Sequence, residues 1–455
     1  MNWLLSRVAS VTGGRLIGAD TALHGVSTDT RGVRPGQLFI ALRGERFDAH
    51  NFLAQAVAAG AAALLVSDET KLPAEAPAVV VADTRLALGA LAGAWRAALA
   101  LPLIAVTGSN GKTTTKEMIA AILKAAVGEA AVLATRGNFN NDIGLPLTLL
   151  ELHAGHHAAV IELGMNHPGE IGYLTGVAKP TVALVTNAQR AHLAGMGDLD
   201  EVAREKGSIF SGLAADGIAV INADDVHAGL WREMAAPHAV RSFAIDRDAD
   251  VRGHVRLHGL STELTLTSAA GEATLKLSVP GRHNARNAVA AAAACLAAGL
   301  PLAAVVAGLA SFAGVKGRLQ RRAGRKGAEI LDDTYNANPD SVRAGIDVLA
   351  ATIGRKILVL GDMGEIGETS GQCHDEIGGY ARSQGIDRLF ALGEASRQAV
   401  RNFGEGARHF CQVEKLLAAV DKELGPETTV LVKGSRFMKM ERVADALAAA
   451  PEEKD

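Results

Sequence analysis

The segment that most constrains the fold is an apolar run that leads directly into a glycine-rich turn and then into a helix-forming stretch. Residues 103–108 read LIAVTG, and the helix-forming stretch TTTKEMIAAILKAA covers 113–126. An uninterrupted apolar run is typical of a strand buried on both faces in a parallel sheet. The segment therefore predicts a strand, a turn and a helix within an α/β layer structure.

The turn between this strand and helix spells GxxGKT. Backbone N–H groups at a helix start, together with the helix dipole, favour a bound phosphate. Lys112 is predicted to contact the β and γ phosphates of a nucleotide, and the Thr113 hydroxyl to coordinate Mg²⁺. Only two residues separate the glycines, where the usual phosphate-loop pattern has four, so the strand and helix on either side carry the prediction. The alternative is an ordinary glycine turn with a surface lysine. The predicted nucleotide-binding residues are Thr107, Gly108, Ser109, Asn110, Gly111, Lys112 and Thr113.

Three later apolar runs also end at polar residues: AAVIE at Glu162, TVALVTN at Asn187 and GIAVIN at Asn222. Ligands of open parallel sheets bind outside the carboxyl ends of the strands, so these residues are expected to converge. Glu162 could supply an oxygen ligand to Mg²⁺. His192, in NAQRAHLAGMG, could hold a second metal ion. The alternatives are a solvated strand-end glutamate and a surface or packing histidine.

The length of 455 residues suggests about three domains. We expect a small α/β domain over 1–98, a central P-loop-type ATPase domain with a mainly parallel sheet over 99–314, and a Rossmann-like domain over 315–455. Alternating residues in TELTLTS and EATLKLS predict an antiparallel hairpin at the far side of the central domain. AEILDD, KILVLGD, RLFALG and TVLVKG repeat the strand, loop and helix rhythm in the last domain. The predicted fold class is three-domain α/β.

Charge and composition narrow the function classes. The formal net charge of −3 and the lack of a basic arm exclude a dedicated nucleic-acid binder. Three cysteines lie far apart, which fits a reducing cytoplasm, and no apolar run approaches the roughly 18 residues of a membrane span. The sequence also lacks NKxD, which a GTPase of the usual kind would carry. We expect a cytoplasmic, monomeric, ATP-dependent small-molecule enzyme.

Motifs over about 25–440 resemble those of the Mur ligases of bacterial peptidoglycan synthesis. These motifs are GVSTDTRGVRPGQLFIALRGERFDAHNF, TGSNGKTTTK, GNFNNDIGLPLTLL, IELGMNHPGEI, TNAQRAHLAGMG, INADD, GRHNARN and LDDTYNANPDS. The resemblance implies an N-terminal domain that holds a UDP moiety, a central ATPase domain and a C-terminal domain that closes over the nucleotide. It also implies that ATP activates a carboxylate as an acyl phosphate, which an amine then attacks.

Within the family, FDAH, YNANPDS and VLVKGSRFMKMERV are similar to the member that joins UDP-N-acetylmuramoyl-tripeptide to D-alanyl-D-alanine. The DNPR stretch expected of the diaminopimelate-adding member is absent. The alternatives are a sibling ligase that adds a single amino acid, and a folylpolyglutamate synthetase, against which the block from STDTR to FDAH argues. A nucleotide-binding regulator is the alternative from another class, but it would not need Glu162, His192 and Lys206 together. The third residue of the peptide stays open between diaminopimelate and lysine.

The resemblance also assigns roles to individual residues. It makes Lys112, Lys206 and His192 catalytic. It also makes Thr113, Glu162, His192 and Lys206 metal ligands, with Lys206 carbamylated. Without the resemblance, Lys206 would be an ordinary solvent-facing helix lysine. For the others, capping, turn formation and packing are the alternatives. The resemblance implies nucleotide contacts at Asn287, His283, Arg318, Asp333 and Tyr335, a UDP-binding turn at Ser27, Asp29 and Arg31, and muramoyl-peptide contacts at Asn138, Asn140 and Asn141.

Overall fold

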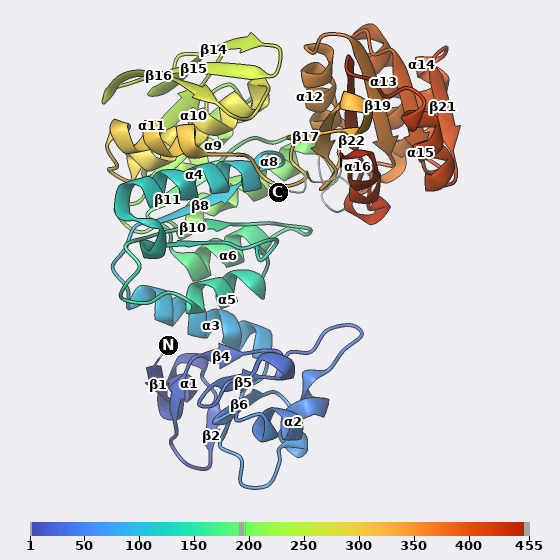
Figure 1. Ribbon diagram of the computed structural model, residues 1–455. Coiled ribbons are helices and arrows are strands. Elements are labelled where there is room, and N and C mark those ends of the chain that lie inside the picture. The colour runs from blue at the N-terminus through green and yellow to red at the C-terminus, as the bar shows by residue number, and fades with distance from the viewer. Residues whose placement is uncertain (1, 191–194, 196, 450–455) are drawn as a thin grey trace, which may run out of the picture.

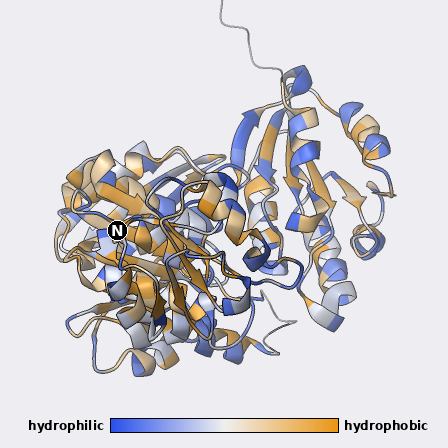
Figure 2. Cartoon of the chain, turned by 90° about the horizontal axis from the view of Figure 1, so that it is seen from below, coloured by the Kyte–Doolittle hydropathy of each residue, from blue (hydrophilic) through white to orange (hydrophobic). Residues whose placement is uncertain are grey.

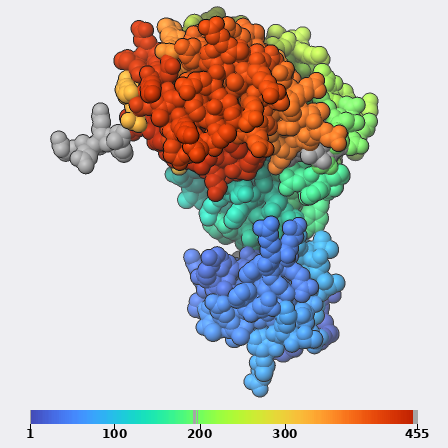
Figure 3. Space-filling view, turned by 90° about the vertical axis from the view of Figure 1, so that its right-hand side faces the viewer, coloured from blue at the N-terminus to red at the C-terminus, as the bar shows by residue number. Residues whose placement is uncertain are grey.

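The computed structural model describes residues 2–190, 195 and 197–449, which form three α/β modules, each built around its own sheet (Figure 1). The N-terminal module runs from β1 to α3, the central module from β8 to α11 and the third module from β17 to α16. The space-filling view shows the N-terminal module as a lobe below the other two (Figure 3). The predicted α/β class is confirmed.

The N-terminal module has a five-stranded sheet in the order β2-β7-β6-β5-β4, with a separate antiparallel pair of β1 and β3. Within the sheet only β2 runs antiparallel to its neighbour. Its strands are β1 (Asn2–Leu4), β2 (Arg15–Ile17), β3 (Ala22–His24), β4 (Val26–Ser27), β5 (Leu38–Ile40), β6 (Ala63–Val66) and β7 (Ala78–Val80), and its helices are α1 (Leu5–Thr12), α2 (Leu53–Ala58) and α3 (Thr84–Ala97).

The central module has a nine-stranded sheet in the order β16-β15-β14-β13-β12-β11-β8-β10-β9. In this order, all strands from β9 at one edge to β14 run parallel to one another. At the other edge, β14, β15 and β16 form an antiparallel meander. The strands are β8 (Leu103–Thr107), β9 (Val132–Ala134), β10 (Ala158–Glu162), β11 (Val182–Val185), β12 (Ile218–Asn222), β13 (Ala239–Ala244), β14 (Val251–His258), β15 (Ser261–Ser268) and β16 (Gly271–Leu277). The predicted hairpin is confirmed as β15 and β16; β13 and β14 were not predicted.

Helices cover both faces of this central sheet. They are α4 (Lys112–Val127), α5 (Gly144–Leu150), α6 (Glu170–Ala178), α8 (Leu199–Gly207), α9 (Ala228–Ala235), α10 (Arg282–Ala297) and α11 (Leu302–Ser311). On one face α4 and the alanine-rich α10 pack against each other and the sheet, because small side chains allow helices to approach closely. On the other face, α5 and α6 contact α3 of the N-terminal module. One hydrophobic core therefore continues from the N-terminal module into the central module.

The third module has a six-stranded sheet in the order β17-β18-β22-β19-β20-β21, in which only β17 is antiparallel. The four predicted apolar runs form β18, β19, β20 and β22. The strands are β17 (Gln320–Ala323), β18 (Glu329–Asp333), β19 (Arg355–Gly361), β20 (Arg388–Leu392), β21 (Ala407–Phe410) and β22 (Thr428–Lys433), and the helices are α12 (Pro339–Ala350), α13 (Ser370–Ser383), α14 (Arg397–Phe403), α15 (Val413–Asp421) and α16 (Glu441–Leu447).

The sheets form the hydrophobic interior of the molecule, and Figure 2 shows their strands largely at the hydrophobic end of the scale. The third module has separate apolar clusters on the two faces of its sheet. Among the residues that the structure describes, no helix is both long and apolar enough to cross a bilayer.

Candidate active site

The phosphate loop follows β8 as the sequence predicts, and α4 begins at Lys112. Gly108 and Gly111 have φ values of 142° and 80°, a region that glycine adopts at little cost. A Cβ on Gly108 would lie 1.9 Å from Thr186 Oγ1, and one on Gly111 would lie 2.3 Å from Asn287 Oδ1. Both positions therefore require glycine, for backbone conformation and for space.

Side chains of the loop are held by the segment after β11. Ser109 Oγ donates to the Gln189 carbonyl, and the Asn110 N–H donates to Asn187 Oδ1 at 2.9 Å. Lys112 Nζ donates to the carbonyl oxygens of Gly108 at 2.7 Å and Ser109 at 3.2 Å, so its cation lies over the loop. Burial lowers the pKa of Lys112, while the nearby Glu162 carboxylate opposes the shift. Buried Thr107 donates to the Leu163 carbonyl at 2.8 Å and fixes the strand end.

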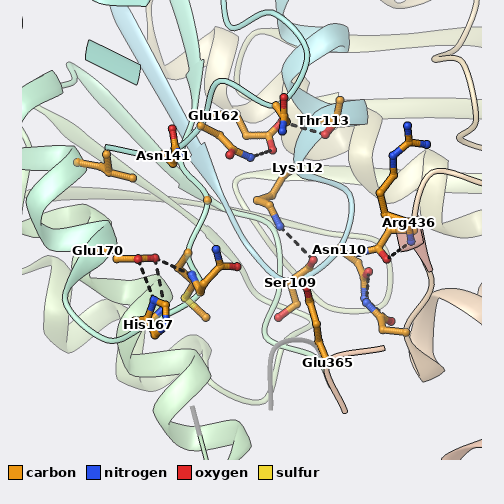
Figure 4. A pocket seen from close by; sticks show the side chains of 18 of the residues that line it. Ser109, Asn110, Lys112, Thr113, Asn141, Glu162, His167, Glu170, Glu365 and Arg436 are labelled. Atoms are coloured by element: carbon orange, nitrogen blue, oxygen red, sulfur yellow. Dashed lines mark hydrogen bonds and ion pairs between the residues drawn. The ribbon is translucent and has the colours of Figure 1, made fainter. Parts of the chain in front are cut away.

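Glu162, at the end of β10, lies beside the loop, as the convergence of strand ends predicts (Figure 4). Its side chain accepts from Thr113 Oγ1 at 2.9 Å on one oxygen and from Asn140 Nδ2 at 2.8 Å on the other. Glu162 is only 3% exposed. Three residues from distant parts of the sequence therefore form one preorganised oxygen-rich cluster.

Lys206, in the last turn of α8, is fully buried, and its Nζ has no hydrogen-bond partner among the described residues. Burial, reinforced by the positive charge of Lys112, holds the pKa of Lys206 well below its ordinary value. Burial beside a second cation favours the neutral amine form of this lysine over the charged form. His192, the other predicted metal ligand, lies outside the described residues. Within those residues, no group of three or more His, Cys, Asp or Glu side chains could hold a metal ion.

Two cavities meet at the phosphate loop. The first, of about 850 Å³, lies between α3, the central loops and the third module. Its lining includes the predicted residues Ser109, Asn110, Gly111, Lys112, Thr113, Asn138, Asn140, Asn141, Glu162, Arg318 and Tyr335. The second, of about 480 Å³, is lined by the predicted nucleotide contacts Asn287, His283, Arg318 and Asp333. Arg318 and part of the phosphate loop line both cavities, so the two spaces adjoin.

The residues predicted to contact the nucleotide have defined neighbours. Asp333, at the end of β18, accepts from Lys433 Nζ at 2.6 Å and from the Leu319 N–H at 3.2 Å. The Arg318 guanidinium lies 4.0 Å from the centre of the Tyr335 ring, a cation–π distance. Burial lowers the pKa of His283 to about 4, so this imidazole is neutral at pH 7.

The asparagine-rich loop before α5 and the proposed UDP-binding turn differ in position. Asn141 Oδ1 accepts from the N–H groups of Ile143 and Gly144 at the start of α5, while Asn140 points to Glu162. Ser27, Asp29 and Arg31 line neither cavity. Asp29 accepts from the Arg31 N–H and guanidinium, which lowers the pKa of Asp29 to about 2. This turn therefore lies away from the phosphate loop.

The central and third modules contact each other through polar groups that sequence reasoning did not identify. Arg190 donates to both Asp340 and Glu376, at distances from 2.7 to 3.1 Å. Asn110 and Asn338 exchange side-chain hydrogen bonds at 2.8 and 3.3 Å. Asn338 also caps α12, and Asn-Pro at a helix start is a visible signal. Nothing in the sequence around Arg190 indicates its partners, which lie 150 and 186 residues further along the chain.

A phosphate loop at the carboxyl ends of a parallel sheet, facing a second α/β module across a nucleotide-sized cavity, defines a multidomain P-loop-type ATP-binding enzyme. Three family models match the chain: the Mur ligase family catalytic domain over 22–96, the Mur ligase middle domain over 106–295 and the Mur ligase glutamate ligase domain over 317–436. The chain belongs to the Mur ligase family.

Three members of this family are similar to the chain over nearly its full length. It is 44% identical over 449 residues to the UDP-N-acetylmuramoyl-tripeptide–D-alanyl-D-alanine ligase of Escherichia coli, covering 97% of this chain and 98% of that one. The structure of UDP-N-acetylmuramoylalanyl-D-glutamyl-2,6-diaminopimelate–D-alanyl-D-alanyl ligase from Acinetobacter baumannii superposes with a TM-score of 0.87, 37% identity and 98% coverage of each chain. The MurF ligase of Thermotoga maritima in complex with ADP has a TM-score of 0.82, 27% identity and coverage of 93% and 96%.

Proposed function

We propose that this enzyme joins D-alanyl-D-alanine to UDP-N-acetylmuramoyl-tripeptide in peptidoglycan synthesis and converts ATP to ADP and phosphate. The observation that carries the proposal is 44% identity to the Escherichia coli ligase over almost the full length of both chains. The site agrees with it, because a phosphate loop and a buried carboxylate face a cavity of about 850 Å³. A cavity of that size has room for the reacting ends of two peptide substrates.

The reaction has two steps in this proposal. A carboxylate oxygen of the tripeptide attacks the γ-phosphorus of ATP, ADP leaves, and an acyl phosphate forms. The amine of D-alanyl-D-alanine then attacks the acyl carbon and loses a proton, and the tetrahedral intermediate expels phosphate. Lys112 and the loop N–H groups are placed to hold the phosphates and to stabilise the developing charge.

Thr113 and Glu162 are suited to hold Mg²⁺ through the hydroxyl and the carboxylate. Their oxygens lie 2.9 Å apart in a partly buried position beside the phosphate loop, and such hard oxygen donors are the ligands that Mg²⁺ prefers. When bound, the ion would neutralise charge on the phosphates. Asn140 fixes the second Glu162 oxygen and so orients the carboxylate. His192 remains part of the proposed metal set from the family resemblance.

We also propose that Lys206 is carbamylated. Burial favours the neutral amine of Lys206, whose Nζ has no hydrogen-bond partner among the described residues, and a neutral amine can add CO₂ and lose a proton to give a carbamate anion. Isotopically labelled bicarbonate should give a protein-bound carbonyl signal in carbon NMR that is absent from Lys206→Ala. Short carboxylic acids should restore part of the activity of that variant. Failure of both results would leave Lys206 as an ordinary buried lysine.

The three modules divide the substrates in our proposal. Residues 1–98 hold UDP through Ser27, Asp29 and Arg31, residues 99–314 hold ATP, and residues 315–455 close over the nucleotide with Arg318 and Asp333. Asn138, Asn140 and Asn141 contact the muramoyl peptide. The ADP complex of the Thermotoga maritima ligase supports nucleotide binding. We propose a cytoplasmic monomer, consistent with three unpaired cysteines.

Phosphate release by the purified protein tests the function. The assay uses ATP and UDP-muramoyl tripeptide, with and without D-alanyl-D-alanine, and mass analysis of the product. Release that depends on the dipeptide, with a muramoyl pentapeptide as product, is expected. Release only with a single amino acid would identify a sibling ligase. Absence of release with every acceptor would indicate a nucleotide-binding regulator.

A further inference from the structure

One wall of the first cavity is made by the N-terminal module and has no role in the reaction described so far. Arg85, at the start of α3, lines the cavity, and its guanidinium forms an ion pair with Asp142 of the loop before α5. The Arg85 side chain is 45% exposed and that of Asp142 is 35% exposed. Leu86, the other described residue of α3 in the lining, carries no charge.

The other cations of this cavity have different tasks or partners. Lys112 binds carbonyl groups of its own loop, and Arg190 is engaged by Asp340 and Glu376. Arg318 stacks on Tyr335 beside the nucleotide cavity, and Arg436 pairs with Glu441 of the third module. Figure 4 shows Asn141 and Arg436 on opposite sides of Lys112. Among the described residues that line the cavity, Arg85 is therefore the only arginine or lysine that belongs to the N-terminal module.

Contacts of one loop connect the phosphate loop with Arg85. Glu162 contacts Thr113 of the phosphate loop and Asn140, and Asp142 follows two residues later in the same loop. Asp142 in turn holds Arg85. A peptide whose reacting carboxylate lies at the phosphate loop, and whose UDP end lies in the N-terminal module, would pass this pair. A guanidinium has five N–H donors, so Arg85 can hold Asp142 and a second carboxylate together.

We propose that Arg85 binds a carboxylate of the donor peptide that the reaction does not consume, with Asp142 orienting the guanidinium. The inference rests on the proposed function, because it takes the donor to be a UDP-muramoyl peptide. The name of the Acinetobacter baumannii relative describes such a donor, with D-glutamyl and 2,6-diaminopimelate residues. A diaminopimelate third residue keeps a free amino-carboxylate end, and a glutamyl residue keeps one free carboxylate. Either can supply the group that Arg85 binds.

The competing interpretation is that the ion pair only fastens α3 to the central module. The two readings differ in what Asp142 does. If the ion pair only held α3 against the central module, loss of either partner would change donor binding to the same extent. If Arg85 binds the donor, Asp142→Asn should leave the arginine charge available, whereas Arg85→Ala removes it.

Donor binding by calorimetry with UDP-muramoyl tripeptide, without ATP, tests the proposal in the full-length protein. We expect Arg85→Ala to weaken the dissociation constant about 10- to 100-fold, the range for loss of a hydrogen bond to a charged group. Arg85→Lys should recover part of this loss, and Asp142→Asn should change it less than about threefold. Arg136→Ala is the matched control, because Arg136 pairs with Glu151 and does not line the cavity. Steady-state kinetics should show a raised KM for the tripeptide and unchanged KM values for ATP and the dipeptide.

Two donors distinguish the source of the carboxylate. A larger loss with the diaminopimelate peptide than with the lysine peptide would assign the third residue, and equal losses would assign the glutamyl carboxylate. Equal effects of Arg85→Ala and Asp142→Asn, or unchanged donor binding in Arg85→Ala, would overturn the proposal. Wild-type binding is measured without turnover, so failure of the ligase assay and failure of this inference are separate results.

Discussion

The two junctions of the central module differ in chemistry. Toward the N-terminal module, Leu88 and Leu91 of α3 belong to the same buried core as Leu145 of α5 and Leu174 of α6. Toward the third module, the contacts include the Arg190 network and the Asn110–Asn338 pair. Leu260 is the one described hydrophobic side chain before position 314 that packs against the third module's apolar clusters. An apolar junction loses its stabilisation when it opens, whereas polar groups can exchange their partners for water.

From this difference we infer which module moves relative to the others. The N-terminal and central modules should move as one body, and the third module should open and close over the nucleotide. The residues proposed to hold metal ions include Thr113, Glu162 and Lys206, and these three lie on the central module. Changes on the central module should therefore reduce the rate of the chemical step, and changes at the polar junction should mainly alter the affinity for the nucleotide.

The largest effect should come from the carboxylate of the central module. Glu162→Gln keeps the shape of the side chain but removes its charge, so kcat should fall about 10²- to 10³-fold, the size seen when one electrostatic contact of a transition state is lost. The melting temperature should stay close to that of the wild type. Glu201→Gln, on the exposed first turn of α8, is the control. Wild-type kcat in Glu162→Gln would contradict the proposed role.

The apolar junction can be broken at Leu91, which is fully buried in the shared core. Leu91→Ala should lower the free energy of unfolding by about 2 to 5 kcal/mol, because it removes buried apolar atoms and leaves a cavity. Leu86→Ala, at a leucine that is 60% exposed on the same helix, should change it by less than about 0.5 kcal/mol. Thermal or urea unfolding measures both. Equal destabilisation by the two variants would remove the contrast between the junctions.

The polar junction can be opened at Arg190 and Asp340. Either Arg190→Ala or Asp340→Asn should raise the KM for ATP about 3- to 10-fold with little change in melting temperature, because the lost contacts are partly exposed. The double variant should be no worse than the worse single variant, since the two side chains share one interaction. Additive effects would show that the residues act independently. A large loss of stability would show that the junction is not free to open.

The last effect depends on pH and concerns His283 at the second cavity. Its pKa is lowered by burial from 6.5 to about 4 in the folded protein. Between these values the unfolded chain binds a proton that the folded chain does not, so this group makes stability fall as pH decreases from 6.5 toward 4. Above 6.5 it makes no contribution to pH dependence. Unfolding of His283→Gln across this range should show a shallower loss, and an unchanged slope would contradict the assignment.

Local signals in the sequence predicted the parts of the site that depend on short segments. The strand, loop and helix around Lys112 and the polar ending of the strand at Glu162 follow from hydrophobic patterning and glycine positions. Strand β14 was not predicted, although VRGHVRLH alternates apolar and polar residues as a half-exposed strand does. The Arg190–Asp340 and Arg85–Asp142 pairs join segments 150 and 57 residues apart. Such pairings are set by how the modules pack, and no local pattern records them.

The transfer of oxygen from the peptide to phosphate tests the central claim most directly. The reacting carboxylate of UDP-muramoyl tripeptide is labelled with heavy oxygen, the purified enzyme is supplied with ATP and D-alanyl-D-alanine, and the released phosphate is analysed by mass spectrometry. An acyl phosphate made at Lys112 and Glu162 predicts one labelled oxygen in each phosphate from a fully labelled peptide. Unlabelled phosphate together with a pentapeptide product would contradict this mechanism.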